Sequence, residues 1–172
     1  MDDEIYWSEE SVTHDGECRQ PTVEDLMNLC RELNHQGAKY VIVGGFAIRG
    51  AGYLRETGNL DMMIETSPEN EARVFRSLEI LPDKAILQLE PGEVNKYTVV
   101  RVADEIVVDL MKSASGIEYE EASKDMVIRT IQDVPIPFAS PRLLWRMKKS
   151  THREKDKADL VFLRQQYPEV VD

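Results

Sequence analysis

The spacing of apolar residues along this chain changes between helical and strand-like periods, which predicts a fold that contains both elements. The segment from Thr22 to Gly37 carries its apolar residues at helical spacing, and Asp25 follows Thr22 at the distance of a capping box. A second helix is predicted from Pro68 to about Leu78, because proline is favoured in the first turn of a helix. A serine and a proline at 140 and 141 predict the start of a third helix.

Short β-branched or apolar runs between these helices predict strands. The predicted strands are residues 41–43, 60–64, 84–89, 97–102, 105–111, 126–131 and 134–138. Only two residues, Ala103 and Asp104, separate one pair of runs, and Gln132 and Asp133 separate another, which predicts two tight hairpins. We expect an α+β fold: a mixed, twisted β-sheet of about five strands flanked by helices, with a C-terminal helix pair beside a cleft.

Length and charge divide the chain into a tail and one domain. At 172 residues it is long enough for one domain with a sizeable core. Residues 1–21 are acidic and poor in apolar side chains, which predicts a flexible tail, and residues 22–167 form the predicted domain. The formal net charge of −11 disfavours indiscriminate nucleic-acid binding. The two cysteines have no metal-site spacing and no apolar run approaches the roughly 18 residues of a membrane span, so a cytoplasmic setting is expected.

The stretch 41–65 brings most of the candidate chemistry together. A buried strand leads into Gly44 and Gly45, which allow a sharp turn into a short helix over 46–54 and leave backbone N–H groups open to an anionic ligand. Asn59 and Asp61 are two positions apart on the next strand, so their side chains leave from the same face. Asp109 is a carboxylate within another apolar strand, where it needs either an ion-pair partner or a function.

These residues resemble the polymerase-beta-like nucleotidyltransferase superfamily, particularly its small bacterial members and the abortive-infection toxins of toxin–antitoxin systems. The family pattern is a strand, two small residues, a helix, an R-x-T turn and D-x-D, and the matching residues are Gly44, Gly45, Arg55, Thr57 and Asp61. The resemblance implies that Asp61 and Asp109 hold Mg²⁺ or Mn²⁺, and that the glycine backbone receives the phosphates of a nucleoside triphosphate. Asn59 departs from the pattern, because it stands where the family has its first metal-binding aspartate.

The C-terminal segment resembles a second signature of the same family. A helix ending in lysine precedes an R-x-K-D-x-x-D helix, and the residues at the matching places are Lys148, Arg153, Lys155, Asp156 and Asp159. The charge also reverses here, since eight Lys or Arg face three acidic residues between positions 142 and 164. This basic segment is either a solvated face or a surface that closes over triphosphate. On the second interpretation Arg55, Thr57, Lys148 and Arg153 are nucleotide-binding residues.

Two functions from different classes follow. The first is a Mg²⁺-dependent nucleotidyltransferase that transfers a nucleoside monophosphate to an acceptor hydroxyl on RNA or protein, as a toxin with an antitoxin partner. Its catalytic residues are Asp61, Asp109 and the position held by Asn59, and loss of one positioned charge costs about 10²-fold or more in rate. The second is a catalytically inactive fold that serves as a nucleotide-binding or protein-interaction module. A weaker third alternative is a purely structural subunit.

Overall fold

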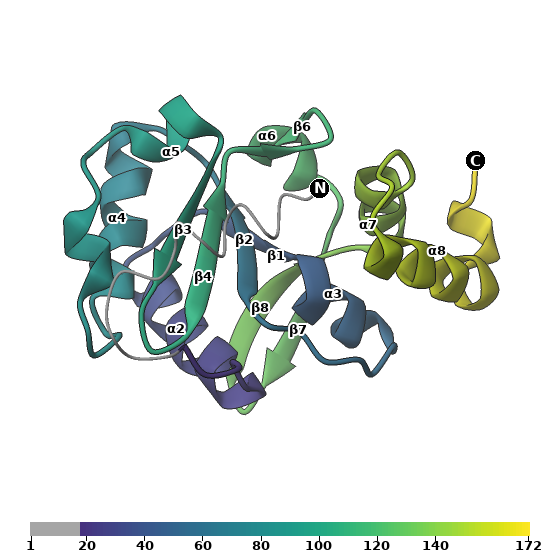
Figure 1. The fold of residues 1–172 in the computed structure, drawn as a ribbon, viewed down its shortest axis with the longest axis horizontal. Helices are drawn as coiled ribbons and strands as arrows, with labels where there is room; N and C mark the ends of the chain where they lie inside the picture. The colour runs from purple at the N-terminus through teal and green to yellow at the C-terminus, as the bar shows by residue number, and fades with distance from the viewer. Residues whose placement is uncertain (1–17) are drawn as a thin grey trace.

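A six-stranded mixed sheet forms the centre of the computed structural model, which describes residues 18–172 (Figure 1). The strands are β1 (Tyr40–Val43), β2 (Leu60–Ile64), β3 (Val99–Ala103), β4 (Val107–Met111), β7 (Met126–Ile131) and β8 (Val134–Ala139). Their order is β3-β4-β2-β1-β8-β7, with β2–β4 and β1–β8 parallel and the other neighbours antiparallel. The predicted α+β class is confirmed, with six strands where about five were expected.

Helices and short elements complete the described chain. They are α2 (Val23–His35), α3 (Gly44–Ala51), α4 (Pro68–Leu78), η1 (Ala85–Gln88), α5 (Glu93–Tyr97), the β5 (Ser113–Ala114) and β6 (Ile117–Glu118) pair, α6 (Tyr119–Ala122), α7 (Pro141–Lys148), α8 (Glu154–Gln166) and η2 (Pro168–Val170). The predicted caps are confirmed. Thr22 and Asp25 form a reciprocal capping box on α2, and Ser140 accepts the N–H of Leu143 at the start of α7.

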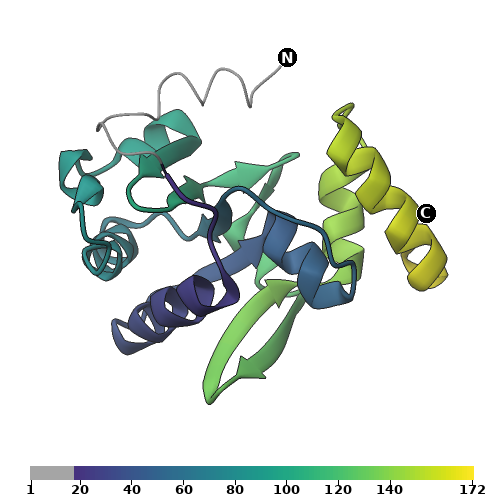
Figure 2. The ribbon, with the colours of Figure 1, turned by 60° about the horizontal axis from the view of Figure 1, so that its bottom comes forward.

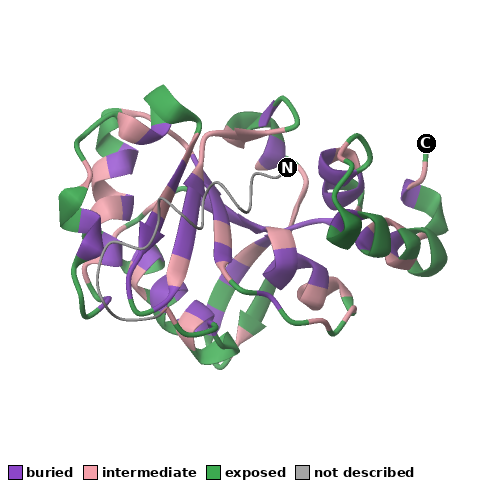
Figure 3. Ribbon diagram, in the orientation of Figure 1, coloured by how far each residue is buried: buried purple, intermediate pink, exposed green. Residues whose placement is uncertain are grey.

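The hydrophobic core lies around the middle strands of the sheet. All four residues of β1 are buried, whereas the edge strand β7 is largely exposed (Figure 3). Helices α2 and α4 contact each other and the sheet, and α3 contacts β1 and β2. Figure 2 shows α7 and α8 side by side, to one side of the sheet. In this arrangement α3, which begins at the C-terminal end of β1, lies between the sheet and the α7–α8 pair.

Aromatic contacts attach the C-terminal helix pair to α3. Tyr53, just after α3, stacks on Phe162 of α8 with ring centroids 5.1 Å apart. The hydroxyl of Tyr167 donates a hydrogen bond to the carbonyl of Ala51 at 2.6 Å. Because α3 begins at the candidate site, these contacts fix the helix pair relative to that site.

The predicted strand over residues 84–89 is wrong, since this segment forms the single turn η1. Ala85 and Ile86 are adjacent and both buried, which one helical turn permits and the alternation of a strand does not. The buried carboxylate of Asp104 also accepts the backbone N–H groups of Asp83 and Ala85, at 2.9 and 2.8 Å, and holds the turn in place. The next strand begins only at Val99, because residues 93–97 form α5.

The two predicted hairpins have different outcomes. Gln132 and Asp133 both take positive φ, 47° and 72°, as a two-residue hairpin turn between β7 and β8 requires. Between β3 and β4, however, the loop has three residues, 104–106, rather than the two expected, and Ala103 pairs with Val107. Side chains alternate between the two faces of a strand, so a register change by an odd number of residues brings the opposite set of side chains to each face. The residue pairs between β3 and β4 are therefore not those that a two-residue loop would give.

The last residues of the predicted tail lie against the domain. Arg19 forms ion pairs with Asp25 at 2.7 Å and with Glu105 at 3.1 Å, and Gln20 donates a hydrogen bond to the carbonyl of Thr57 at 3.2 Å. Residues 1–17 of that tail lie outside the described residues, and the division into a tail of residues 1–21 and a domain of residues 22–167 stays a prediction. Within the described chain, no helix is both long enough and apolar enough to cross a membrane.

Candidate active site

Two carboxylates and an arginine lie in one row across neighbouring strands of the sheet. Asp61 on β2 is the direct partner of Asp109 on the parallel strand β4, and Asp109 is the direct partner of Arg101 on β3. Directly paired residues place their side chains on the same face. The sequence predicted the two aspartates as site residues, and the fold brings them together.

Asn59 joins these carboxylates through its amide. Its Nδ2 donates to Oδ1 of Asp61 at 3.0 Å and also donates to Oδ2 of Asp109. An amide nitrogen carries two hydrogens, so it serves both acceptors at once, whereas an amide oxygen facing two carboxylates would be repelled. The expected position of Asn59 beside Asp61 is confirmed, and its side chain acts as a hydrogen-bond donor.

Arg101 is a residue of this site that the sequence did not reveal. Its guanidinium binds the Asp109 carboxylate through two bonds, Nε to Oδ1 at 2.9 Å and Nη2 to Oδ2 at 3.0 Å. Such fork-to-carboxylate pairs are the stronger kind of charged hydrogen bond. The missed signal was the length of the β3–β4 loop, because only the three-residue loop pairs Arg101 with Asp109.

Asp61 is the carboxylate whose ionisation this environment disfavours. Desolvation by the surrounding protein and the neighbouring charge of Asp109 together raise the pKa of Asp61 to about 7, and a hydrogen bond with Asp109 acts in the same direction. The positive charges of Lys155 and Lys148 act the other way. Both lysines are therefore close enough to the row to influence its electrostatics.

The N-terminus of α3 lies against Asp61. The glycine pair forms the first turn of this helix, which ends at Ala51, rather than preceding a helix over 46–54 as the sequence predicted. Gly44 has φ of 68°, and a side chain there would collide with the Asp61 carboxylate. The N-cap residue of α3, Val43, makes no side-chain hydrogen bond to the helix. The first N–H groups of α3 therefore receive no acceptor from the N-cap side chain, and the helix begins close to the Asp61 carboxylate.

Replacing Gly45 by alanine is expected to lower the free energy of unfolding by about 1 kcal/mol, as overpacking does. The added Cβ would lie 2.5 Å from Oγ1 of Thr57, so the turn carrying Thr57 must shift. Urea denaturation measures the change. Gly58→Ala is the matched control, since nothing lies within 4 Å of its added Cβ, and equal stability of the two variants would contradict the close approach.

The R-x-T turn is attached to the site and to α8. Thr57 is buried and donates its hydroxyl hydrogen to the carbonyl of Asn59 at 3.0 Å, which fixes the backbone just before β2. Arg55 binds the buried Asp159 of α8 through two hydrogen bonds, Nε to Oδ1 and Nη2 to Oδ2, each 2.8 Å long. This pair connects positions 104 residues apart in the chain.

The C-terminal signature residues form an ion-pair cluster. Lys148 is buried and lies 2.9 Å from Asp156 and 3.1 Å from Asp159. Asp156 also accepts hydrogen bonds from Thr151 at 2.7 Å and from Arg153 at 2.9 Å. Burial alone would raise the pKa of Asp156, but Lys148 and these donors lower it to about 2. The roles of Arg55, Lys148 and Arg153 in nucleotide binding stay predictions, because each is engaged by an aspartate of α8.

No protein-family model and no curated protein matches this sequence. Two of the solved structures that share its arrangement are described as nucleotidyltransferases or as similar to them. One is a proposed nucleotidyltransferase from Thermotoga maritima, with a TM-score of 0.52 and 14% identity over 86% of this chain and 92% of that one. The other is an antigenic nucleotidyltransferase-like protein from Paracoccidioides brasiliensis, with a TM-score of 0.50 and 15% identity over 86% of this chain and 76% of that one. The chain has the nucleotidyltransferase fold.

On this nucleotidyltransferase fold, the residues present do not fit a divalent metal ion. Mg²⁺ takes oxygen ligands in nearly octahedral geometry, so its protein ligands must turn free carboxylate oxygens toward it. Both oxygens of Asp109 and one of Asp61 instead accept hydrogen bonds from Arg101 or Asn59. Among the described residues, no group of three or more His, Cys, Asp or Glu side chains converges on a potential metal position.

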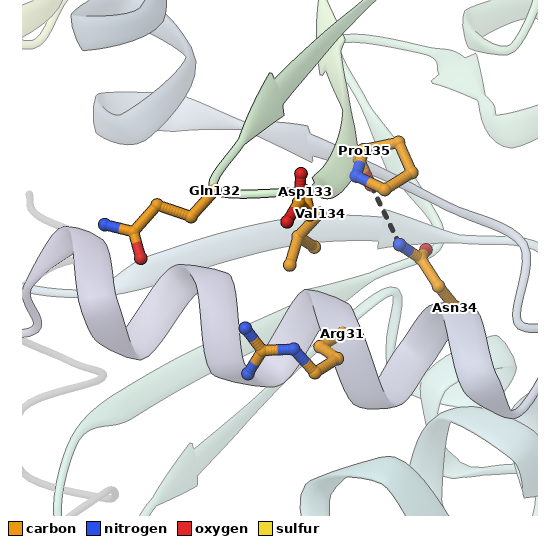
Figure 4. A pocket seen from close by; sticks show the side chains of 6 residues that line it. All are labelled: Arg31, Asn34, Gln132, Asp133, Val134 and Pro135. Carbon is orange, nitrogen blue, oxygen red and sulfur yellow. Dashed lines mark hydrogen bonds between the residues drawn. The ribbon is translucent and has the colours of Figure 1, made fainter.

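A cavity of about 380 Å³ lies at the opposite end of the sheet from the row, between α2 and the β7–β8 turn (Figure 4). Two of its polar side chains are already engaged. Asn34 donates to the carbonyl of Pro135 at 2.8 Å and accepts from the Tyr40 hydroxyl at 2.8 Å. Arg31 in turn binds Asn28 at 3.0 Å. We interpret this cavity as a packing gap beside a hairpin turn, so the row of β2, β3 and β4 remains the candidate site of this nucleotidyltransferase fold.

Proposed function

We propose that this protein is a nucleotide-binding module on a nucleotidyltransferase fold: it holds a nucleoside triphosphate beside the carboxylate row and does not transfer the nucleotide. The observation that carries the proposal is the double hydrogen bond from Asn59 to Asp61 and Asp109. Nucleotidyl transfer uses carboxylates to hold the metal ions that stabilise the attacking and leaving oxygens. Asn59 both removes one such carboxylate and occupies oxygens of the other two.

The start of α3 supports binding of phosphate. Backbone N–H groups at a helix N-terminus attract anions, and Gly44 and Gly45 let a ligand approach them closely. Lys148 and Lys155 add positive potential at Asp61. The whole chain carries excess negative charge, with 32 Asp and Glu against 21 Lys and Arg. Positive side chains beside the row, on a chain of net negative charge, therefore favour a small anionic ligand over indiscriminate nucleic-acid binding.

Nucleotidyl transfer with Mg²⁺ or Mn²⁺ is the second candidate. The observation that favours it is that Asp61 and Asp109 lie at the same level of adjacent parallel strands, where the two carboxylates could share one ligand if Arg101 and Asn59 released them. An RNA or protein acceptor, a toxin role and an antitoxin partner belong to this candidate and stay predictions.

Calorimetric titration of ATP, GTP, CTP and UTP into the wild-type protein and into Asn59→Asp tests the proposal. We expect the wild type to bind at least one nucleotide, with a dissociation constant of about 1 mM or lower. Transfer assays with α-labelled nucleotide, RNA and the protein itself as acceptor are expected to give no labelled product with either form. Asn95→Asp is the matched control, because it adds the same charge at an exposed position of α5.

Two results would contradict this proposal in different ways. The absence of binding of every nucleotide would remove the nucleotide-binding function. Labelled product from Asn59→Asp, but not from Asn95→Asp, would instead establish the transferase candidate, because the single missing carboxylate would then be what separates the chain from activity.

A further inference from the structure

We propose that Arg101 replaces a divalent metal ion as the positive charge of this site, so that a nucleoside triphosphate binds there without Mg²⁺. This inference rests on the proposed nucleotide-binding function and adds one property to it: nucleotide binding does not depend on a metal ion. It follows from the misfit described above, since the side chains that would hold a metal ion are bound to protein donors instead.

The first step of the argument is the position of Arg101. It is the direct partner of Asp109 in the β3–β4 pairing, and its two hydrogen bonds to Asp109 reach the oxygens that would otherwise face a metal ion. Only 13% of the Arg101 side chain and 8% of the Asp109 side chain are exposed. A pair with so little solvent contact interacts more strongly than a surface pair, so the guanidinium stays in place.

The second step concerns charge. Two carboxylates facing the phosphates of a nucleotide would repel them, and a metal ion ordinarily removes that repulsion. Here Arg101 balances Asp109, and the Asn59 amide donates its hydrogens to both carboxylates. Arg101 and the Asn59 amide therefore reduce the negative charge that the row presents to an anion, even without a metal ion.

The third step concerns competition. A divalent ion held by both carboxylates would have to displace the Arg101 fork from Asp109 and turn the Asn59 amide away from both carboxylates. Magnesium ions also lose their bound water reluctantly, which makes that exchange less favourable still. Removal of the arginine charge should reverse the preference, because Asp61 and Asp109 would then need a cation from solution.

The experiment compares nucleotide binding by calorimetry in excess EDTA and in Mg²⁺, for the wild type, Arg101→Gln and Arg101→Lys. We expect the wild-type dissociation constant to agree within about twofold between the two buffers. In EDTA, Arg101→Gln should bind about tenfold more weakly or worse, with recovery in Mg²⁺, and Arg101→Lys should retain most of the metal-free binding. Arg129→Gln on the opposite edge strand β7 is the matched control, expected to behave as the wild type.

A second measurement needs no nucleotide. Electron paramagnetic resonance of Mn²⁺ should show no ion bound to the wild type at about 1 mM and a bound ion on Arg101→Gln. Wild-type nucleotide binding that EDTA abolishes, or wild-type uptake of Mn²⁺, would overturn this inference and leave the nucleotide-binding function standing. No nucleotide binding by the wild type in either buffer would overturn the proposed function and, with it, the inference.

Discussion

Replacing Asp159 by alanine is expected to lower the free energy of unfolding by about 3 kcal/mol, because truncating one member of a buried ion-pair network leaves its partners unpaired. Asp159 is fully buried and binds both Arg55 and Lys148. Arg55 would lose both of its bonds to α8, and buried Lys148 would keep only Asp156. Urea denaturation followed by circular dichroism measures the change.

Glu154→Ala provides the control for Asp159→Ala on the same helix. Glu154 pairs with Lys157 at 3.1 Å, but both side chains are mostly exposed, so its removal should cost under about 1 kcal/mol, including the effect of its place in the first turn of α8. A loss from Asp159→Ala as small as that of the control would show that the cluster does not clamp α8 to the R-x-T turn. The R-x-K-D-x-x-D residues would then be available for a ligand.

Replacing Asp61 by asparagine is expected to stabilise the protein at pH 8 by about 2 kcal/mol and to change its stability little at pH 4. Burial and Asp109 raise the pKa of Asp61 from 3.8 to about 7, so the folded state resists ionisation that the unfolded state permits. The free energy of unfolding of the wild type therefore falls as pH rises from about 4 to about 7 and is level above that range. The expected stabilisation is about half of what a pKa change from 3.8 to about 7 corresponds to in free energy, because Asp61 is partly in contact with solvent.

Thermal and urea denaturation between pH 4 and pH 8 test this dependence for the wild type, Asp61→Asn and the control Glu90→Gln, which removes a carboxylate from an exposed loop. Asp156 does not interfere in this range. Burial opposes its ionisation but Lys148 lowers the pKa of Asp156 to about 2, so its contribution is lost only at lower pH. A stability difference between Asp61→Asn and wild type that stays constant from pH 4 to pH 8 would contradict the raised pKa.

The two predictions concern two groups of charged side chains in which negative and positive charges are balanced differently. In the C-terminal cluster, two aspartates face three cationic side chains and hold the helix pair in place. In the row, two carboxylates share one guanidinium and one amide, and the hydrogen bond that Asp61 accepts comes from the neutral amide of Asn59. A carboxylate with a raised pKa at a strand end beside a helix N-terminus is typical of a functional site rather than of a stabilising one.

Much of the fold followed from local pattern. Capping chemistry placed the starts of α2 and α7, and the strand pattern placed Leu60–Ile64 at its observed bounds. The side-by-side arrangement of Asn59 and Asp61 followed from the two-residue period of a strand, which does not depend on the rest of the molecule. Residues 84–89 were misassigned because a carboxylate nineteen positions away in sequence from Ala85 holds that segment in a turn.

The sequence by itself determined that Asn59 and Asp61 lie side by side, because this follows from the periodicity of a single strand. The grouping of Asp109 with them, and the expectation of an aspartate at position 59, followed from the resemblance to nucleotidyltransferases. Only the tertiary structure decided which charges meet. Arg101 reaches Asp109 because the β3–β4 loop has three residues, and Arg55 reaches Asp159 because α8 packs beside α3. Ion pairs depend on distances of a few ångströms, and register and helix packing, which no local pattern specifies, set those distances.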